Sequence, residues 1–177
     1  MGPSSVNVIL ETERLLLREF VPADVDELAL VICDRENMRF YPALFERSDA
    51  EAWIQRNLRR YREQRIGLWA MILKSEARLV GDCGLVYQNV NGTTEVEVGY
   101  HLNRAYQGRG LATEAARACR DYAFQALGLT RVISLIRPEN LPSRRVAERN
   151  GMKMEGEALC MGLPHLIYVA TASKSGA

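Results

Sequence analysis

The stretch AYQGRGLATEA, residues 105–115, decides the fold class because it joins a predicted strand directly to a predicted helix. Before it, residues 94–102 read TEVEVGYHL and alternate with a period of two, which is typical of a strand. After it, a helix is expected from about Arg109 to Leu127, where Gly128 ends it. The first turn of a helix exposes backbone N–H groups and carries the positive end of the helix dipole. The junction is therefore suited to binding an anion.

The glycines of this stretch indicate which kind of anion could bind there. Gly108 and Gly110 have no Cβ atom, so a bulky phosphate can approach the main chain closely. A Walker loop requires GK[ST], which the sequence lacks, and the dinucleotide fingerprint requires a glycine where Thr113 stands. Gln107, Gly110 and Ala112 match a third pattern, Q/R-x-x-G-x-G/A. A glycine turn that enters a helix without any ligand is the alternative, and the loop alone does not exclude it.

The rest of the chain alternates strand and helix patterns, which predicts an α/β fold in a single domain, 1–177, with a frayed tail at about 172–177. Asn91-Gly92 is a strong hairpin turn signal, and Ser48 and Glu51 have the spacing of a capping box. The expected strands are 14–20, 68–74, 78–87, 94–102, 131–136, 153–159 and 165–171, and the expected helices are 22–35, 48–64, 109–127 and 140–151.

Composition and charge exclude several classes of function. The chain has 177 residues, 25% of them charged, with a formal net charge of +1, so direct nucleic-acid binding is not expected. No apolar run has the length of a membrane span, and the first ten residues do not resemble a secretory signal. We therefore expect a cytoplasmic protein without membrane contact. The four cysteines, too far apart for a metal knuckle or a redox pair, are expected as small core residues, and no metal is expected.

Two segments, 95–124 and 137–157, carry a resemblance to a known family. They read EVEVGYHLNRAYQGRGLATEAARACRDYAF and RPENLPSRRVAERNGMKMEGE, and together they resemble the GNAT superfamily of N-acetyltransferases. More narrowly, they resemble the branch that acetylates ribosomal-protein N-termini, as do residues 11–28 and 162–170 near the two ends. The resemblance implies acetyl-CoA as cosubstrate, no metal, and direct transfer to an amine. It also implies an α/β (α+β) fold: a mixed, mostly antiparallel sheet of about six to seven strands, splayed at its centre and flanked by about four helices.

The resemblance places CoA in the splay and assigns residues to it. The pyrophosphate is expected on the backbone N–H groups of residues 109–113, and the extended pantetheine arm is expected to pair like a strand with residues 100–102. Asn140 is expected beside the arm, although a helix cap explains it equally well, and Ser143 near the thiol end, although it also suits a first helical turn. The residues expected at the cofactor are Tyr100, His101, Leu102, Gln107, Gly108, Arg109, Gly110, Leu111, Ala112, Thr113, Asn140 and Ser143.

The expected catalytic base lies on the strand before the loop. Glu95 and Glu97 share one face of that strand, and Glu97 stands in EVGY, where the family commonly has a carboxylate. Two like charges in a partly dry site raise at least one pKa toward neutrality, which suits a general base. The alternative is an exposed polar face. His101 is interpreted as structural or cofactor-lining, while His165 and Tyr168 are candidates to face the acceptor.

The sequence departs from the family in its catalytic acid. Many members have a tyrosine seven residues after the asparagine that matches Asn140, and here that position is Ala147. Either Ser143 or water then protonates the departing thiolate, or no acid is needed. Some relatives carry a glutamate base after the last helix, where this chain has Gly162. The predicted catalytic residues are therefore Glu97 and Ser143, with Glu95, His165 or water as alternative bases.

The sequence does not identify the molecule that accepts the acetyl group. A peptide or protein N-terminus, a small amine such as an antibiotic or polyamine, and a CoA-binding sensor without turnover are the three hypotheses. Glu97, Asn140 and Ser143 argue against the sensor. The arginines of residues 47–65 are interpreted as a solvated helix face, with attraction of an acidic partner as the alternative. The oligomeric state is open, a homodimer included.

Overall fold

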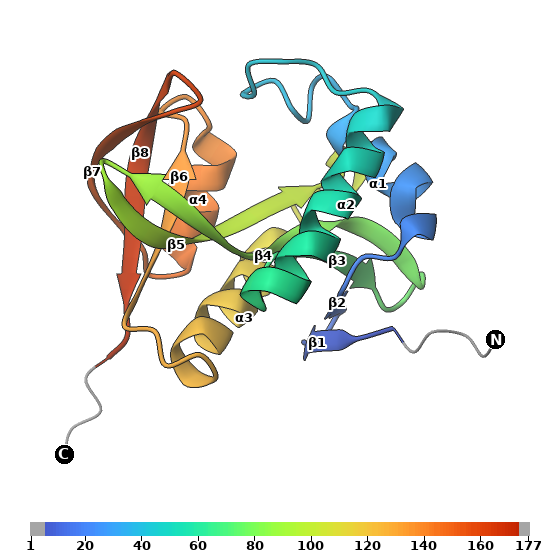
Figure 1. The fold of residues 1–177 in the computed structure, drawn as a ribbon, viewed down its shortest axis with the longest axis horizontal. Coiled ribbons are helices and arrows are strands. Elements are labelled where there is room, and N and C mark those ends of the chain that lie inside the picture. Colours follow the sequence, from blue (N-terminus) through green and yellow to red (C-terminus); the bar gives the residue numbers. More distant parts are fainter. Residues whose placement is uncertain (1–5, 174–177) are drawn as a thin grey trace.

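The computed structural model describes residues 6–173 and shows one eight-stranded sheet with helices on both faces (Figure 1). The strand order is β1-β2-β3-β4-β5-β6-β8-β7, and every neighbouring pair is antiparallel except β5 with β6. The strands are β1 Val8–Glu11, β2 Leu15–Arg18, β3 Leu68–Leu73, β4 Arg78–Val90, β5 Thr93–Leu102, β6 Arg131–Ile136, β7 Lys153–Cys160 and β8 Leu163–Thr171.

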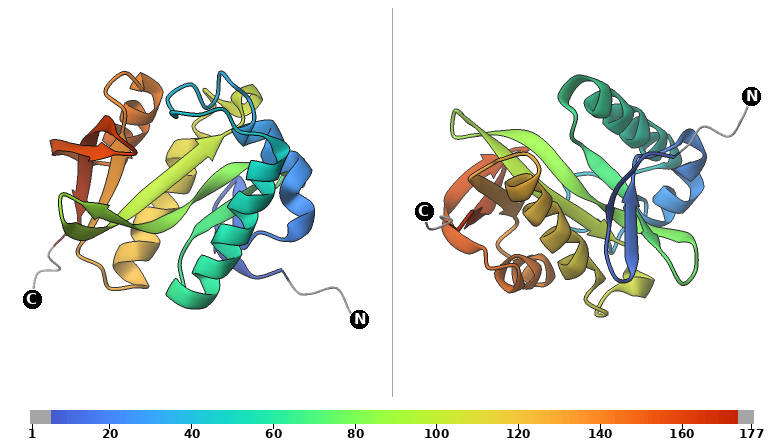
Figure 2. Two further views of the ribbon diagram at one scale, coloured as in Figure 1. Left: turned by 45° about the horizontal axis from the view of Figure 1, so that its top comes forward. Right: turned by 90° about the horizontal axis from the view of Figure 1, so that it is seen from below.

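The helices divide between the two faces of the sheet (Figure 2). The first pair, α1 and α2, pack against each other on one face, while α3 crosses β4 and β5 on the other face and contacts α4. Trp69 of β3 is 1% exposed, and its ring meets that of Tyr122 on α3 edge to face, with centroids 5.8 Å apart. The helices are α1 Val25–Ile32, α2 Arg47–Gln64, α3 Leu111–Gln125 and α4 Leu141–Arg149, with short 3₁₀ helices η1 Pro22–Asp24 and η2 Arg104–Tyr106.

The sheet opens between its two central parallel strands. Glu97 on β5 is paired with Ile133 on β6, and no other register pair joins these strands within residues 6–173. Beyond this pair, hydrogen bonds between a side chain and the backbone take the place of backbone pairing. Ser134 Oγ donates to the carbonyl oxygen of Val98 at 2.7 Å, and the N–H of Leu135 donates to Glu97 Oε1 at 3.3 Å. The carboxyl-terminal half of β5 therefore leaves β6, and the predicted splay at the centre of the sheet is confirmed.

One main hydrophobic core spans both halves of the splayed sheet. It joins buried residues of β2–β5 and of helices α1, α2 and α3 to Val132 of β6, Leu166 of β8 and Ala147 of α4. A smaller cluster joins Ile133 of β6 and Val169 of β8 to Val90 and Ala158. Because buried apolar surface contributes roughly 25 cal/mol per Å², this shared packing holds the two halves together beside the opening.

Within the described residues the sheet has eight strands, where about six to seven were expected. The additional strand is β1, a four-residue edge strand whose half-exposed side chains carry no clear alternation. The capping box of α2 is formed by Glu46 and Asp49, two residues earlier than the expected Ser48 and Glu51, so that expectation was wrong. The hairpin turn was right, since Asn91 and Gly92 both have positive φ. Most of the expected frayed tail, residues 174–177, lies outside the described residues.

Candidate functional site

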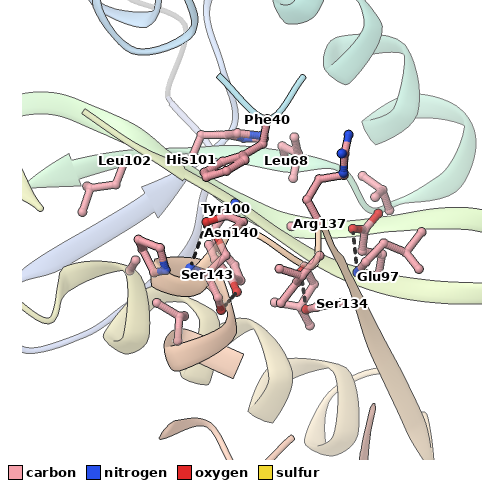
Figure 3. Close-up of a pocket in the computed structure, with 18 of the residues that line it drawn as sticks. Phe40, Leu68, Glu97, Tyr100, His101, Leu102, Ser134, Arg137, Asn140 and Ser143 are labelled. Atoms are coloured by element: carbon pink, nitrogen blue, oxygen red, sulfur yellow. Dashed lines mark hydrogen bonds between the residues drawn. The ribbon is translucent and has the colours of Figure 1, made fainter. Parts of the chain in front are cut away.

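A cavity of about 640 Å³ occupies the opening between β5 and β6 (Figure 3). This volume is in the usual range for a small-molecule site. Residues 97–102 of β5 form its floor, residues 134–137 form the β6 side, and the first turns of α3 and α4 close one end. The part of α2 around Trp53 and the loop residues Phe40 and Tyr41 form the opposite wall. The cavity therefore passes from one face of the sheet to the other.

The loop before α3 is shaped as the sequence indicated. Gly108 and Gly110 have φ of +76° and +79°, a left-handed conformation that favours glycine, and Gly110 caps α3. A Cβ on Gly108 would have no atom within 4 Å, so the backbone there is open to a ligand. Gln107 Nε2 donates to the carbonyl oxygen of Leu102 at 3.0 Å and ties the loop to the end of β5. The first-turn N–H groups of α3 thus stand at the cavity wall, together with the lining residues Leu111, Ala112 and Thr113.

Arg109 differs from its neighbours in this loop. It is not among the cavity-lining residues, because its guanidinium lies over the ring of Tyr106 at 5.2 Å and donates to the carbonyl oxygen of Ala105 at 3.2 Å. Its own carbonyl oxygen accepts from Arg14 Nη1 at 2.8 Å. The side chain of Arg109 therefore faces away, and only its backbone N–H stays a candidate for the cofactor. The other eleven residues expected at the cofactor do line the cavity.

The start of α4 is fastened to β5 at the cavity. Asn140 Oδ1 accepts from the N–H of Ser143 at 3.2 Å, so the helix-cap interpretation of Asn140 is correct. Tyr100 donates its hydroxyl to the carbonyl oxygen of Ser143 at 2.8 Å, as the dashed lines of Figure 3 show. Burial raises the pKa of Tyr100. A tyrosine hydroxyl from β5 therefore lies beside Ser143. The family's usual tyrosine position on α4 is occupied by Ala147, which is fully buried.

Glu97 is the carboxylate that faces the cavity. Its Oε2 accepts from Gln88 Nε2 at 2.7 Å and its Oε1 from the N–H of Leu135 at 3.3 Å. Burial raises the pKa of Glu97 despite these two hydrogen bonds, which lower it. Glu95 does not line the cavity, because it pairs with Arg131 at 3.1 Å. The expectation that Glu95 raises the pKa of Glu97 was therefore wrong, because the cause of the raised pKa is burial.

A buried hydrogen-bonded chain runs through His101, and the sequence did not reveal it. His101 Nδ1 lies 2.7 Å from Asp82 Oδ1, and its Nε2 lies 2.6 Å from the hydroxyl of Tyr41. Asp82 is 0% exposed, and its second oxygen accepts from Trp53 Nε1 at 2.8 Å. Burial lowers the pKa of His101, but the charge and hydrogen bond of Asp82 outweigh it, so the pKa is raised.

The cross-strand register explains this chain. Asp82 on β4 stands opposite His101 on β5, so both side chains leave the same face of the sheet, toward α2 and the 33–46 loop. The regular register also settles the orientation of His101, which shares a face with Glu97. A charged residue inside the apolar strand RLVGDCGLVY was the available signal in the sequence. Its partners are distant in the chain, and no local pattern identifies them.

Comparison with known proteins agrees with this arrangement. Residues 14–153 match the family model described as an acetyltransferase (GNAT) domain. The chain belongs to the GNAT acetyltransferase family. It is therefore an acyltransferase, and the resemblance seen in the sequence is confirmed.

The relatives described here cover more than four fifths of this GNAT chain. The uncharacterized protein YkkB of Bacillus subtilis is 35% identical over 144 residues, which cover 81% of this chain and 84% of that protein. The putative ribosomal N-acetyltransferase YdaF of Bacillus subtilis is 30% identical over 153 residues, covering 82% and 81%. A GNAT acetyltransferase structure from Bacillus anthracis has a TM-score of 0.78 at 30% identity and covers 92% of this chain and 97% of that one.

The remaining wall of the GNAT cavity includes two residues that were candidates to face the acceptor. His165 of β8 lines the cavity, and its Nδ1 lies 2.9 Å from the carbonyl oxygen of Leu163. Tyr168 is not among the lining residues, since its hydroxyl accepts from Arg144 at 3.1 Å and donates to Glu148 at 3.0 Å on α4. His165 is therefore placed at the cavity, and Tyr168 is part of the packing under α4.

The described residues, 6–173, also bear on the expectations about metals, membranes and cysteines. They hold no group of three or more His, Cys, Asp or Glu side chains arranged to bind a metal ion. None of their helices is both long and apolar enough to cross a membrane. The four cysteines are free; Cys83 and Cys119 are buried together, with their Sγ atoms 3.5 Å apart, while Cys33 and Cys160 are only half-buried. The core interpretation therefore fits two of the four.

Proposed function

We propose that this GNAT chain transfers the acetyl group of acetyl-CoA directly to a primary amine. The observation that carries this proposal is the cavity between β5 and β6, which joins three features in one space. They are the free edge of a parting strand, the first turn of α3, and a buried carboxylate on Glu97. An extended diamide, a pyrophosphate and an ammonium group are the natural partners of these three features.

The chain's own residues fit the cofactor from end to end. The backbone N–H groups of residues 109–113 would hold the pyrophosphate, and the glycines at 108 and 110 leave room for it. Tyr100, His101 and Leu102 would pair with the pantetheine arm along the edge that β6 leaves unpaired. Asn140 and Ser143 lie at the start of α4, beside the expected thiol end. When bound, acetyl-CoA supplies an activated thioester, and direct transfer needs only that amine and thioester are held side by side.

Two proton movements are assigned to groups at the cavity. Glu97 takes a proton from the acceptor ammonium, directly or through a water, and its raised pKa suits that role near neutral pH. Ser143 lies where the sulfur departs, and its hydroxyl provides a proton or a hydrogen bond there. Tyr100 adds a second hydroxyl within the same corner, 2.8 Å from the carbonyl oxygen of Ser143. Ser143 and Tyr100 would thus protonate the departing thiolate, as a tyrosine at the position of Ala147 does in many family members.

A peptide or protein N-terminal amine is the acceptor that we favour, in the cytoplasm, where free cysteines persist. Support comes from the similarity to the putative ribosomal N-acetyltransferase YdaF. A small amine is the second candidate, because a cavity of about 640 Å³ is large enough to enclose one. A CoA-binding module without turnover is the third, and the buried carboxylate of Glu97 argues against it.

Acetyl-CoA turnover with a panel of amines tests the proposed function. The panel contains short peptides with free N-termini, polyamines and aminoglycosides, and each reaction is followed by thiol release and by the mass of the product. We expect thiol release that depends on an amine and yields an N-acetyl product. Binding of CoA without thiol release for any member would instead support the sensor module. The Glu97→Gln variant, assayed in parallel, controls for release that does not use the site.

A further inference from the structure

Two arginines of α2 stand at the acceptor side of the cavity. Arg56 and Arg60 are four residues apart, so they share one face of the helix, and both line the cavity. Arg60 is half-buried, so the expectation of a solvated helix face fails for it, whereas Arg56 is exposed and borders the cavity from that face. Arg59, one residue earlier than Arg60, does not line the cavity and is exposed. The structure thus separates two arginines at the cavity from the others of α2.

Neither cavity arginine has an anionic partner in the protein. Within residues 6–173, no carboxylate oxygen lies within 4.0 Å of the guanidinium of Arg56 or Arg60. Arg47 on the same helix shows the contrast, because it pairs with Asp26 and Glu51. Arg60 donates to Asn57 Oδ1 at 3.4 Å, a long contact, and that oxygen already accepts from the N–H of Leu68 at 2.9 Å.

Arg60 is half-buried and lies near the like charge of Arg56. Burial lowers the pKa of Arg60, and the like charge of Arg56 lowers it further. The guanidinium of Arg56 lies over the ring of Trp53 at 5.1 Å, which fixes its plane. A stacked guanidinium keeps its fork of N–H donors available for a carboxylate. Among residues 6–173, the two side chains are therefore donors without a carboxylate acceptor.

A third arginine reaches the same cavity from the sheet. Arg137 follows β6 directly, lines the cavity and is drawn beside it in Figure 3. One of its terminal nitrogens pairs with Glu139, whereas its Nε is buried without a hydrogen-bond partner among the described residues. An unpartnered buried N–H group is unfavourable unless a ligand satisfies it. This observation is independent of α2 and indicates a further hydrogen-bond acceptor in the cavity.

Glu97 does not explain these charges. The positive charge of Arg60 lowers the pKa of Glu97, so the two groups interact through space. No ion pair joins them within 4.0 Å, and both oxygens of Glu97 already accept hydrogen bonds from Gln88 and Leu135. A single carboxylate also cannot balance the two guanidinium groups of Arg56 and Arg60. The unbalanced charge is therefore available to a ligand.

We propose that the acceptor is an amine that carries a carboxylate, and that Arg56 and Arg60 bind this carboxylate while Arg137 extends the site. This inference rests on the proposed function and names its substrate class. A carboxylate beside the amine comes either from acidic side chains of a peptide or from a small amino acid. A polycation such as spermidine meets the same arginines as like charges and is disfavoured.

The test compares matched amines and matched variants. The probes are the peptide amides Ser-Glu-Glu and Ser-Lys-Lys, free glutamate and spermidine, each assayed for kcat/KM with acetyl-CoA. We expect Ser-Glu-Glu or free glutamate to be the best substrate, and the better of the two identifies the source of the carboxylate. Replacing both arginines, Arg56→Gln with Arg60→Gln, is expected to lower kcat/KM for that substrate by about 10- to 100-fold, the worth of hydrogen bonds to a charged group. The Arg59→Gln control, on the same helix, is expected to leave it unchanged.

A charge reversal gives the experiment a second readout. Arg60→Glu is expected to lower kcat/KM for Ser-Glu-Glu and to raise kcat/KM for Ser-Lys-Lys. Loss of folding would instead lower kcat/KM for both peptides. The inference is overturned, and the acetyltransferase left intact, by either of two results. The first is that the wild type uses the acidic and basic peptides equally and does not prefer free glutamate to spermidine; the second is that the double variant keeps the wild-type preference. If no probe is acetylated, calorimetry of Ser-Glu-Glu and of free glutamate with the CoA-saturated protein decides. Binding of either that the double variant loses supports the inference, and absence of binding by both overturns it.

Discussion

Glu97 on β5 and Ile133 on β6 are paired at the point where the two parallel strands separate. The same residue that ends the ladder places its carboxylate in the cavity that the separation creates. The backbone beyond Glu97, from Val98 to Leu102, then lines the opening. One local feature of the sheet therefore provides both the expected cofactor edge and the expected base, which explains why no dedicated domain is needed for either.

Substitution of Glu97 by glutamine tests the base. Glutamine keeps the size and hydrogen bonds of the side chain but cannot accept a proton as a base. General-base help is typically worth about 10²- to 10⁴-fold, so kcat is expected to fall within that range while the affinity for acetyl-CoA changes little. Burial raises the pKa of Glu97, and the base acts only when ionised. The wild-type rate is therefore expected to fall as the pH drops through this raised pKa, above the value of about 4.3 for an ordinary glutamate.

Glu95→Gln is the matched control for that experiment. Glu95 pairs with Arg131 and does not line the cavity, so its loss is expected to leave kcat and the acidic limb of the pH–rate profile in place. The Glu97→Gln enzyme should lose that limb. Normal turnover of Glu97→Gln at saturating amine would show that another base, such as His165 or water, takes the proton.

Substitutions of Ser143 and Tyr100 test which group protonates the leaving thiolate. Ser143→Ala removes the hydroxyl but keeps the carbonyl that accepts from Tyr100. We expect turnover to fall more than CoA affinity in Ser143→Ala, because the hydroxyl acts when the sulfur departs. Steady-state kinetics and CoA titration measure the two quantities. Equal losses of kcat and affinity would make Ser143 a binding residue only, and Tyr100→Phe then shows whether the tyrosine is the donor.

The His101–Asp82 pair predicts a pH-dependent stability. Asp82 and its hydrogen bond raise the pKa of His101 above its unfolded value of about 6.5, against the opposing effect of burial. Tyr41, Trp53 and Glu97 face the same pair. A raised histidine pKa stabilises the fold fully below the unfolded pKa, and this contribution is lost as the pH rises through the folded pKa. Asp82→Asn is expected to lower the free energy of unfolding by about 3–5 kcal/mol at pH 6 and by less at pH 9.

Urea unfolding at the two pH values measures this difference. Asp121→Asn is the control, since Asp121 forms a partly exposed pair with Arg120, and its loss is expected to remain below about 1 kcal/mol at both pH values. An Asp82→Asn loss that is the same at pH 6 and pH 9 would mean that the histidine does not titrate in this range. The pair would then act only as a neutral hydrogen bond.

The parts of this protein that the sequence predicts are those set by local chemistry. The glycine loop before α3 was predictable because the left-handed backbone at Gly108 and Gly110 favours glycine, and the helix starts directly after them. The cap at Asn140 was predictable for the same reason. The buried strand β6 was predictable from its continuous apolar run. Each of these features depends on residues within one turn or one strand.

The parts that the sequence did not predict depend on pairing over long distances. Tyr41, Trp53, Asp82 and His101 meet only because β4 and β5 align in register beneath α2. The role of the arginines on α2 was equally hidden, because periodicity defines a helix face but not what lies opposite it. The side chain of Arg109 faced away through a stacking contact that loop patterns do not encode.

Calorimetric titration of CoA into the Gly110→Asp and Gly110→Asn variants tests the central claim most directly. Gly110 has φ of +79°, so both substitutions introduce similar backbone strain, and only aspartate adds a negative charge at the start of α3. If the backbone there holds the pyrophosphate, Gly110→Asp should bind CoA far more weakly than Gly110→Asn, while thermal unfolding shows that both variants fold. Equal CoA affinities for the two variants, close to that of the wild type, would contradict the placement of the cofactor between β5 and the first turn of α3.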